Sequence, residues 1–515
     1  MKILITAAEV APYVSVGGLS QVMYFLPRSL AKKGHSVRIF TAKYGEMDKT
    51  SPDKKPWRLR EEFTKLQIPD IKVRCSISSF IKRGSPKAFF LENKEYFELR
   101  ANVFGYKDDH MRFALLSKGC LEWLSHLKKS HDPWWPDIIH ANDWHTGYFI
   151  DMARRNDRYK SLLLKTPIVF TVHNFSFQGN INFRYLPEKK RDDGTKPLEG
   201  LTSSKLIMQN ALLRGIINAD AVNTVSQTHA IEVLDPEYGE GLDTVLNRVR
   251  GKLTGILNGL DTKEFNPATD PIIKNNYSAR NFVPARKKNK LALQKEFGLV
   301  QDASRPLIAV SGRISTQKGW DLILEVLPRL LSEKKETQFL VMGQGDEHYQ
   351  NELLNLAKQF PEQLALHLQT DFKIPRRIYS GADMILLPSI FEPGGIVALE
   401  ALRYGTVPIV RRTGGLNDII RDFNPNRLSG NGFSFTNKSP WSLFATIITA
   451  LSIYNQPSVF KRLVKNCLKS DFSWDHAANE YLNWYEKVIE VRRRATSTTP
   501  HPAYKPELDE RVDFA

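Results

Sequence analysis

The sequence is poor in cysteine and lacks a long apolar run. Its 515 residues hold three cysteines, Cys75, Cys120 and Cys467, which lie far apart and form no CxxC pair. This spacing indicates neither a disulfide framework nor a zinc site. The apolar run at the N-terminus is broken by Glu9 after a few residues, too soon for a signal peptide or a membrane span. We therefore expect a cytoplasmic protein without a membrane partner.

Two further patterns are missing. No GxGxxG follows the first predicted strand and no acidic residue ends the second, SVRIFTA, which disfavours a dinucleotide-dependent dehydrogenase. The formal net charge is +17, but the basic residues form short scattered groups without the patterns of RNA-binding domains or zinc fingers. We therefore expect no nucleic-acid partner. The charge fits a solvated basic surface or phosphorylated small-molecule ligands.

Two stretches of the chain alternate β-branched strands with helical runs. Strands are predicted at 2–7, 36–42, 137–143, 166–174 and 219–226 in the first half, and at 306–313, 338–346, 382–389 and 406–412 in the second. Apolar strands separated by helices predict parallel sheets covered on both faces. Residues 255–290 between the halves are rich in Asn, Pro and Lys, which favours a hinge or linker. The sequence thus predicts two doubly wound α/β domains facing across a ligand-binding cleft.

The first turn, PYVSVGGLSQ, opens a helix with Gly17 and Gly18. Exposed N–H groups and the helix dipole favour an anion at such a turn. Its nearest upstream polar neighbours are Tyr13 and Ser15, so the turn has no cation of its own.

Polar side chains follow two later strands of the first half. The stretch HANDWH places His140, Asp143 and His145 where a strand ends, and His173 and Asn174 end the next strand. Ligands of open sheets bind at this edge. The two histidines of HANDWH lack the spacing of a helical metal-binding pair, so substrate-facing or core histidines are favoured over a metal site.

The second half supplies cations at a strand end. Arg313 and Lys318 flank a loop that leads into a helix. A guanidinium fork and an ammonium point charge together suit a pyrophosphate. Because positive charge opposes the dipole at a helix start, an anion is expected nearby.

Two glutamates accompany a second glycine turn. Glu392 precedes Gly394 and Gly395, and Glu400 follows eight residues after Glu392. At 100° per residue, eight steps leave about 80° between two positions, so both carboxylates share one side if the helix begins early. Such carboxylates suit sugar hydroxyls or a ribose.

With these motifs in order, the chain resembles the glycogen and starch synthases, retaining glucosyltransferases of the GT-B fold. The similarity runs from about residue 2 to residue 488 and includes HANDWH, FTVHNFSFQG, ADAVNTVS, GILNGLDTKEFNPATD, SGRISTQKG, RRTGGL and DFSWDHAANEY. The resemblance implies two Rossmann-like domains. These are an N-terminal acceptor-side domain at 1–262 and a C-terminal nucleotide-sugar-binding domain at 263–480. A helix at 481–494 is expected to pack back on the N-terminal domain. Composition predicts a disordered tail at 495–515.

The resemblance also implies an activity, the transfer of glucose from ADP-glucose to the non-reducing end of an α-1,4-glucan with retention of configuration. It assigns Arg313 and Lys318 to the donor diphosphate, Glu392 to the transferred glucose, and His173 and Asp143 to the sugar subsite. The implied substrate-binding residues are Ser15, Gly17, Gly18, His140, Asn174, Asn258, Phe372, Tyr379, Gly394, Gly395, Glu400, Thr413 and Gly414. The implied partners are the nucleotide sugar and the glucan. No metal or other cofactor is expected, because the two cations can stabilise the leaving diphosphate.

The sequence departs from the family pattern where the donor is expected to bind. Ser15 and Gln21 stand where a lysine and an acidic residue are usual, Phe372 only approximates an adenine-stacking aromatic, and Glu400 is atypical of bacterial glycogen synthases. Three hypotheses therefore stay open. They are an ADP-glucose-dependent α-glucan synthase, a related retaining glycosyltransferase with UDP-glucose or another donor or acceptor, and a non-catalytic glucan-binding homologue.

Overall fold

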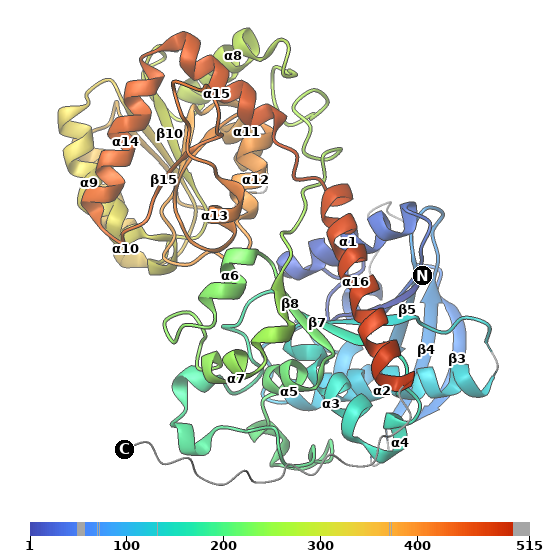
Figure 1. The fold of residues 1–515 in the computed structure, drawn as a ribbon. Helices are drawn as coiled ribbons and strands as arrows, with labels where there is room; N and C mark the ends of the chain where they lie inside the picture. The colour runs from blue at the N-terminus through green and yellow to red at the C-terminus, as the bar shows by residue number, and fades with distance from the viewer. Residues whose placement is uncertain are drawn as a thin grey trace, which may run out of the picture.

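The computed structural model describes residues 1–48, 57–69, 71, 73–130, 132–369, 371 and 373–497. These residues form two α/β domains, the N-terminal one blue to green and the C-terminal one yellow to orange (Figure 1). Each strand predicted from the sequence coincides with an observed strand, so the predicted alternation of strands and helices is confirmed.

The N-terminal domain is built on a twisted, mostly parallel sheet. Its strands are β1 (Lys2–Thr6), β2 (Ser36–Ala42), β3 (Arg60–Gln67), β4 (Arg74–Phe80), β5 (Lys87–Glu92), β6 (Ile138–Asn142), β7 (Ile168–Val172), β8 (Ala221–Thr224) and β9 (Leu253–Gly255). Within the described residues their order is β3-β4-β5-β2-β1-β6-β7-β8-β9, and only β4 runs antiparallel to its neighbours. The order reverses between β1 and β6, which makes a topological switch point at their carboxyl ends.

Helices cover both faces of this sheet. They are α1 (Gly18–Lys32), α2 (Asp109–Lys129), α3 (Gly147–Arg155), α4 (Asp157–Lys160), α5 (Ala211–Asn218), α6 (Gln227–Glu232), α7 (Asp243–Arg248) and, from the far end of the chain, α16 (Trp474–Ser497). Successive side chains of β1 point to opposite faces of the sheet and belong to two different hydrophobic cores. Ile3 and Ile5 pack with α1 and α16, whereas Leu4 packs with α2, α3 and α5.

The C-terminal domain repeats this plan with a smaller sheet. Its strands are β10 (Leu307–Ser311), β11 (Gln338–Met342), β12 (Leu364–His367), β13 (Met384–Leu387), β14 (Val407–Arg411) and β15 (Phe433–Phe435), all parallel and ordered β12-β11-β10-β13-β14-β15. Its helices are α8 (Phe282–Glu296), α9 (Trp320–Glu333), α10 (Glu347–Gln359), α11 (Ile374–Gly381), α12 (Ile396–Arg403), α13 (Gly414–Ile419), α14 (Pro440–Tyr454) and α15 (Pro457–Lys469). The order reverses between β10 and β13, so this sheet also has a switch point.

The observed linker is shorter than the one predicted from composition at 255–290. Residues 282–290 belong to α8, and the preceding segment packs on the C-terminal domain. Tyr277, which is buried in that domain's core, donates its hydroxyl to the Tyr404 carbonyl at 2.7 Å. Polar composition concealed this packing because single apolar residues such as Ile273 and Tyr277, rather than a periodic stripe, carry it.

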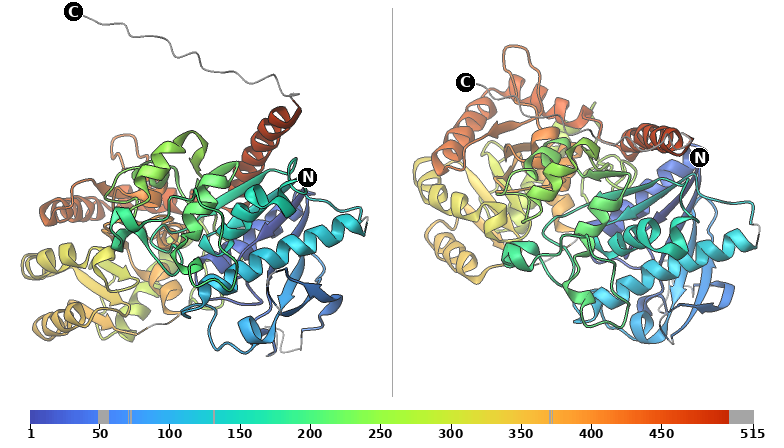
Figure 2. Two further views of the ribbon diagram at one scale, coloured as in Figure 1. Left: turned by 90° about the horizontal axis from the view of Figure 1, so that it is seen from below. Right: turned by 60° about the horizontal axis from the view of Figure 1, so that its bottom comes forward.

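The C-terminal helix is longer than predicted. Instead of 481–494 it spans Trp474–Ser497, so the expected tail is wrong for residues 495–497, while residues 498–515 lie outside the described part of the chain. Its buried side chains, among them Trp474, Tyr481 and Tyr485, recur every three to four residues and pack on the N-terminal domain. Phe25 of α1 stacks on Trp474 with ring centroids 6.1 Å apart. Figure 2 shows α16 crossing back onto the N-terminal domain.

In the part of the chain that the structure describes, no single helix is long and apolar enough to cross a bilayer, and α14 and α15 reach that length only together, across a 110° bend. Cys75, Cys120 and Cys467 are free and buried.

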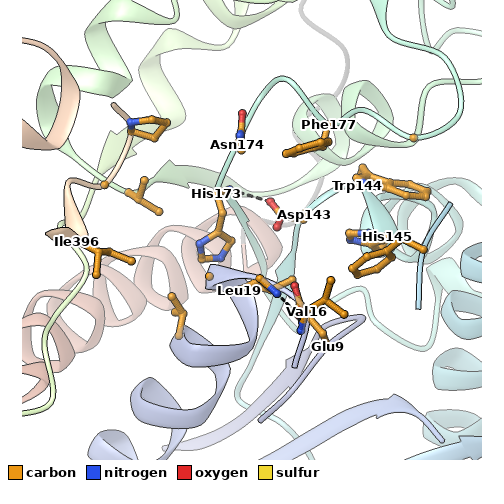
Figure 3. A pocket seen from close by; sticks show the side chains of 18 of the residues that line it. Glu9, Val16, Leu19, Asp143, Trp144, His145, His173, Asn174, Phe177 and Ile396 are labelled. Carbon is orange, nitrogen blue, oxygen red and sulfur yellow. Dashed lines mark hydrogen bonds between the residues drawn. The ribbon is translucent and has the colours of Figure 1, made fainter. Parts of the chain in front are cut away.

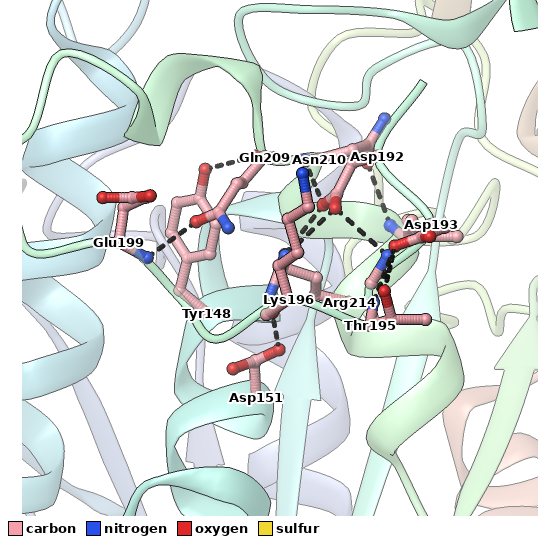
Figure 4. A network of polar contacts seen from close by, with 12 residues as sticks. Tyr148, Asp151, Asp192, Asp193, Thr195, Lys196, Glu199, Gln209, Asn210 and Arg214 are labelled. Atoms are coloured by element: carbon pink, nitrogen blue, oxygen red, sulfur yellow. Dashed lines mark hydrogen bonds and ion pairs between the residues drawn. The ribbon is translucent and has the colours of Figure 1, made fainter. Parts of the chain in front are cut away.

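A buried cation holds a long loop of the N-terminal domain in place. Arg214 of α5 is fully buried and donates to both oxygens of Asp192, with Nε 2.7 Å from Oδ2, and to Asp151 Oδ2 of α3 at 3.0 Å from Nη1 (Figure 4). A fourth bond, 3.1 Å long, joins its Nη1 to the Lys196 carbonyl. The loop that contains Asp192 is thereby tied to two helices.

Removing this cation should destabilise the N-terminal domain. In Arg214→Met the two carboxylates stay buried without their partner, and we expect the free energy of unfolding to fall by about 3–5 kcal/mol. The matched control is Arg184→Met, because Arg184 is 59% exposed and pairs with Glu240 at the surface. That variant should lose less than about 1 kcal/mol. Urea unfolding measures both, and equal losses would contradict the role given to Arg214.

Candidate functional site

The switch points of the two sheets face each other across a cleft. A cavity of about 870 Å³ between the domains is lined by Asp143 and His173 from one side and by Arg313, Lys318 and Glu392 from the other. A second cavity, of about 610 Å³, continues from the first, because Gly17, Gly18, Asn258 and Arg313 line both. The structure therefore brings together all the residues predicted to be catalytic.

The N-terminal side of the first cavity is formed by the ends of two neighbouring strands. Asp143 follows β6 with φ 56°, a strained conformation for a non-glycine residue. It is held there because its Oδ1 accepts a 2.7 Å hydrogen bond from the His173 amide at the end of β7 (Figure 3). The His173 ring lies 3.1 Å from Asn142 Oδ1 through Nε2.

Burial shifts the pKa values of this pair in opposite directions. The pKa of Asp143 rises to about 7, mainly by burial, with the His173 amide opposing the shift and the charge of Glu9 adding to it. Burial lowers the pKa of His173 to about 4. His173 is therefore neutral at neutral pH, and Asp143 titrates there.

Glu9 is a site residue that the sequence reasoning missed. It follows β1, lines the first cavity, and its Oε2 accepts hydrogen bonds from the amides of Val16 at 2.8 Å and Gly17 at 2.9 Å. Burial raises the pKa of Glu9, and these two bonds oppose the rise. The Gly17 amide is thus occupied by a carboxylate rather than free for a phosphate, although Gly17 and Gly18 do line the cavity. The sequence feature that could have pointed to Glu9 is the presence of an acidic residue in the loop that contains the glycine pair.

The C-terminal side carries the two expected cations. Arg313 follows β10 and its Nη2 donates to Gln317 Oε1 at 3.1 Å. Lys318 forms an ion pair with Glu392, whose Oε2 also accepts from Ser389 Oγ at 3.2 Å. Glu392 is therefore the anion expected near these cations, and it pairs with Lys318.

The two glutamates of the second glycine turn lie on different cavities. Helix α12 begins at Ile396, so Glu392 precedes the helix, and the early helix start that would place both carboxylates on one side does not occur. Glu392 lines the first cavity and Glu400 the second. Burial raises the pKa of Glu400 to about 7, with a hydrogen bond from Tyr379 and the charge of Arg376 opposing the shift.

Most of the other predicted binding residues line the cleft. Asn174, Gly394 and Gly395 border the first cavity, Ser15 and Tyr379 the second, and Asn258 both. Phe372 lies outside the described residues.

The structure does not support a binding role for three predicted residues, none of which lines either cavity. His140 is fully buried, with Nδ1 2.7 Å from the Tyr485 hydroxyl and Nε2 2.6 Å from Thr171 Oγ1, so it anchors α16 to the sheet. Thr413 Oγ1 and the Gly414 amide instead donate to a carboxylate of the N-terminal domain, that of Glu232. Both corrections arise from contacts between segments far apart in the sequence.

Aromatic side chains form a further wall of the first cavity that the sequence reasoning did not single out. Phe104, Tyr106, Trp144 and Phe177 line it, and Phe177 is 64% exposed. Trp144 and Phe177 lie together beside Asp143 in Figure 3. Among the described residues, no group of three or more His, Cys, Asp or Glu side chains is placed to hold a metal ion.

The raised pKa of Asp143 predicts a pH-dependent cost to stability. Its pKa is about 7 when folded against a usual 3.8, so between these values the folded state keeps a proton that the unfolded state has released. Wild-type stability therefore falls through this window as the pH rises. Asp143→Asn removes the charge and retains an oxygen acceptor for the His173 amide.

We expect the excess stability of Asp143→Asn over wild type to grow from about pH 4 to about pH 7 and to stay constant above. Urea unfolding of both proteins across this range measures the difference. A difference independent of pH would show that Asp143 titrates normally.

Comparison with known proteins agrees with this geometry. The model of the starch synthase catalytic domain matches residues 2–248, and that of the group 1 glycosyl transferases matches residues 294–466. The glycogen synthase of Clostridium beijerinckii is 35% identical over 510 residues, covering 95% of this chain and 99% of that protein. The glycogen synthase of Lacticaseibacillus casei is 36% identical over 499 residues, with the same coverage.

Solved structures show the same relationship. The catalytic domain of starch synthase IV from Arabidopsis thaliana, bound to ADP and acarbose, has a TM-score of 0.78 and 31% identity, over 95% of this chain and 99% of that one. A sucrose-phosphate synthase from Thermosynechococcus elongatus shares the fold. Its TM-score is 0.54 and its identity 16%, over 95% of this chain and 99% of that one. The chain therefore belongs to the glycogen and starch synthase family and is a hexosyltransferase of the two-domain GT-B fold, as its motifs predicted.

Proposed function

We propose that this glycogen and starch synthase homologue uses ADP-glucose as donor and transfers its glucose to the non-reducing end of an α-1,4-glucan with retention of configuration. The observation that carries the proposal is one cavity with Arg313, Lys318 and Glu392 on one wall and Asp143 and His173 on the other. ADP and acarbose in the related starch synthase IV support a nucleoside diphosphate and an oligosaccharide as ligands. An enzyme is favoured over the non-catalytic alternative. A cytoplasmic location stays a prediction.

The cations act on the leaving group. Breaking the bond between glucose and phosphate leaves negative charge on the diphosphate, and donors preorganised around that charge lower the barrier. Arg313 can bind two phosphate oxygens with its planar fork, and Lys318 adds a point charge. Lys318 already lies against Glu392, so a donor bound there places its diphosphate next to the carboxylate that faces the sugar.

The opposite wall receives the sugar. The His173 amide occupies Asp143 Oδ1, so the second carboxylate oxygen is the one left for a glucose hydroxyl. The Asn142 amide nitrogen donates to the Thr6 carbonyl at 3.3 Å, so Asn142 Oδ1 is the acceptor toward His173. His173 Nε2 therefore carries the proton and Nδ1 is an acceptor. Positive charge developing on the sugar thus meets neutral or anionic oxygen and nitrogen acceptors.

The aromatic wall suits the glucan acceptor. Tyr106, Trp144 and Phe177 line the first cavity together with Asn180 and Asn182. Apolar faces with a few amides between them match the mixed C–H and hydroxyl surface of a sugar chain. Closing this wall over the reacting atoms would exclude water and favour transfer to the glucan over hydrolysis.

The second cavity suits the nucleoside of the donor. Glu400 and Tyr379 line it, and a carboxylate there suits the ribose hydroxyls. Ser15 lines the same cavity and is exposed, so the cleft lacks the cation that the family usually places there. These two departures motivate the second candidate donor, UDP-glucose.

A donor comparison tests the proposal. With glycogen as acceptor and diphosphate release as the readout, we expect kcat/KM for ADP-glucose to exceed that for UDP-glucose by about 10-fold or more, as expected when a site is built to bind one base. Lys318→Met should lower kcat/KM by about 100-fold or more with either donor, because a charge on the leaving group loses its partner. A preference for UDP-glucose would contradict the donor assignment, and no glucan elongation with either would contradict the function.

The Ser15 position gives a second test. Ser15→Lys adds a cation beside the cavity that Arg313 lines, and we expect it to lower the KM for the donor by about 3- to 10-fold through charge-assisted bonds to phosphate. The matched control is Ser15→Met, similar in length but uncharged, which should leave this KM unchanged. Steady-state kinetics distinguish the two. An equal effect of lysine and methionine would place the donor phosphates away from residue 15.

A further inference from the structure

Helix α6 of the N-terminal domain contacts the loop that carries Glu392. Ser226 caps the start of α6, where its hydroxyl accepts from the His229 amide at 3.3 Å. The same fully buried hydroxyl donates to the Pro393 carbonyl of the C-terminal domain at 2.7 Å. One side chain thus caps a helix in one domain and holds the residue next to Glu392 in the other.

The other end of α6 holds a second C-terminal loop. Glu232 Oε1 accepts from Thr413 Oγ1 at 2.9 Å and from the Gly414 amide at 3.1 Å. Beside it, Thr228 donates its amide to Asp418 Oδ2 of α13 at 3.0 Å. Both ends of α6 therefore contact segments of the C-terminal domain.

The loop held by Glu232 packs directly on Glu392. The Gly415 amide donates to the Glu392 carbonyl at 2.9 Å. A Cβ placed on Gly414 would lie 2.2 Å from that same carbonyl oxygen, so the two loops touch with no room for a side chain. Packing this close transmits a displacement of one loop to the other.

We propose that Ser226 and Glu232 are positioning residues for the transfer, holding Glu392 from the opposite domain at the distance from Asp143 and His173 that the reaction needs. Neither side chain lines the cavity of the reacting groups. The inference rests on the hexosyltransferase activity of the family and is independent of which nucleotide carries the glucose.

The position of these contacts predicts which kinetic constant changes. Arg313 and Lys318 belong to the C-terminal domain, whereas the hydrogen bonds from α6 and its cap reach Pro393 and residues 413–418, so both cations remain available to the donor diphosphate when these bonds are lost. The sugar, in contrast, is bound by groups of both domains. Loss of Ser226 or Glu232 contacts should therefore lower kcat with little change in donor KM.

The first experiment compares two glutamates that both bridge the domains. Glu237 forms an ion pair with Lys438 of the C-terminal domain through partly exposed side chains, so Glu237→Gln is the matched control for Glu232→Gln. We expect kcat to fall about 10-fold or more in Glu232→Gln, since small displacements of reacting groups cost this much, and to stay within about twofold in Glu237→Gln. Donor KM should change by less than about threefold in both.

A second variant keeps the test independent of Glu232. Ser226→Ala removes the bond to Pro393 together with a helix cap. Its control is Asn156→Ala, which removes the cap that accepts from the Arg158 amide at the start of α4 and no inter-domain bond. Only Ser226→Ala should lower kcat. Because the loops held by Ser226 and Glu232 pack on each other at Glu392, Ser226→Ala/Glu232→Gln should lose less than the product of the single losses.

The readouts separate positioning from general damage and from a wrong donor assignment. All variants are assayed with whichever nucleoside diphosphate glucose the wild type uses best, at a temperature where circular dichroism shows each to be folded, and binding of the corresponding nucleoside diphosphate is titrated. Reduced kcat with unchanged nucleotide affinity supports the proposal. Equal loss in Glu232→Gln and Glu237→Gln, parallel loss of nucleotide affinity, or unchanged kcat in both Ser226→Ala and Glu232→Gln would overturn it.

Discussion

The ion pair between Lys318 and Glu392 is the interaction on which the proposed chemistry depends. It joins the loops after β10 and β13, the two strands between which the C-terminal sheet reverses its order, and it faces the corresponding reversal between β1 and β6. A cation for the leaving phosphate and a carboxylate for the sugar are thereby held together before any ligand binds. Preorganisation of this kind reduces the cost of arranging charges during the reaction.

The surrounding structure keeps the two sheet edges opposed. Helix α16 returns from the C-terminal domain and is anchored in the N-terminal sheet through His140, while α6 extends from the N-terminal domain to the loops around Glu392. Because each domain holds part of the other, the cleft has a defined width. Burial of polar groups beside the cleft has a cost. The charged form of Asp143, for example, is disfavoured by its burial.

Much of the site could be predicted because it is local. Arg313, Lys318 and Glu392 each follow an apolar strand, and parallel strands deliver the residues after them to one edge. Glu9 was missed because its role depends on the shape of a turn. The observed strands β3, β4, β5, β9, β12 and β15 were not predicted, and β3 was missed because its charged, mostly exposed residues resemble a loop. His140, Thr413 and Gly414 were misassigned because motif membership does not reveal which partner a buried polar group finds.

The sequence by itself determined the alternation of strands and helices, the two domains and the chemical groups at each strand end, because hydrophobic periodicity and turn composition act over short distances. The tertiary structure alone decided that Glu9 occupies the Gly17 amide, that Glu392 and Glu400 open on separate cavities, and that Glu232 reaches across to Gly414. The physical reason is that a buried polar group must be paired, and its partner is set by packing between segments hundreds of residues apart.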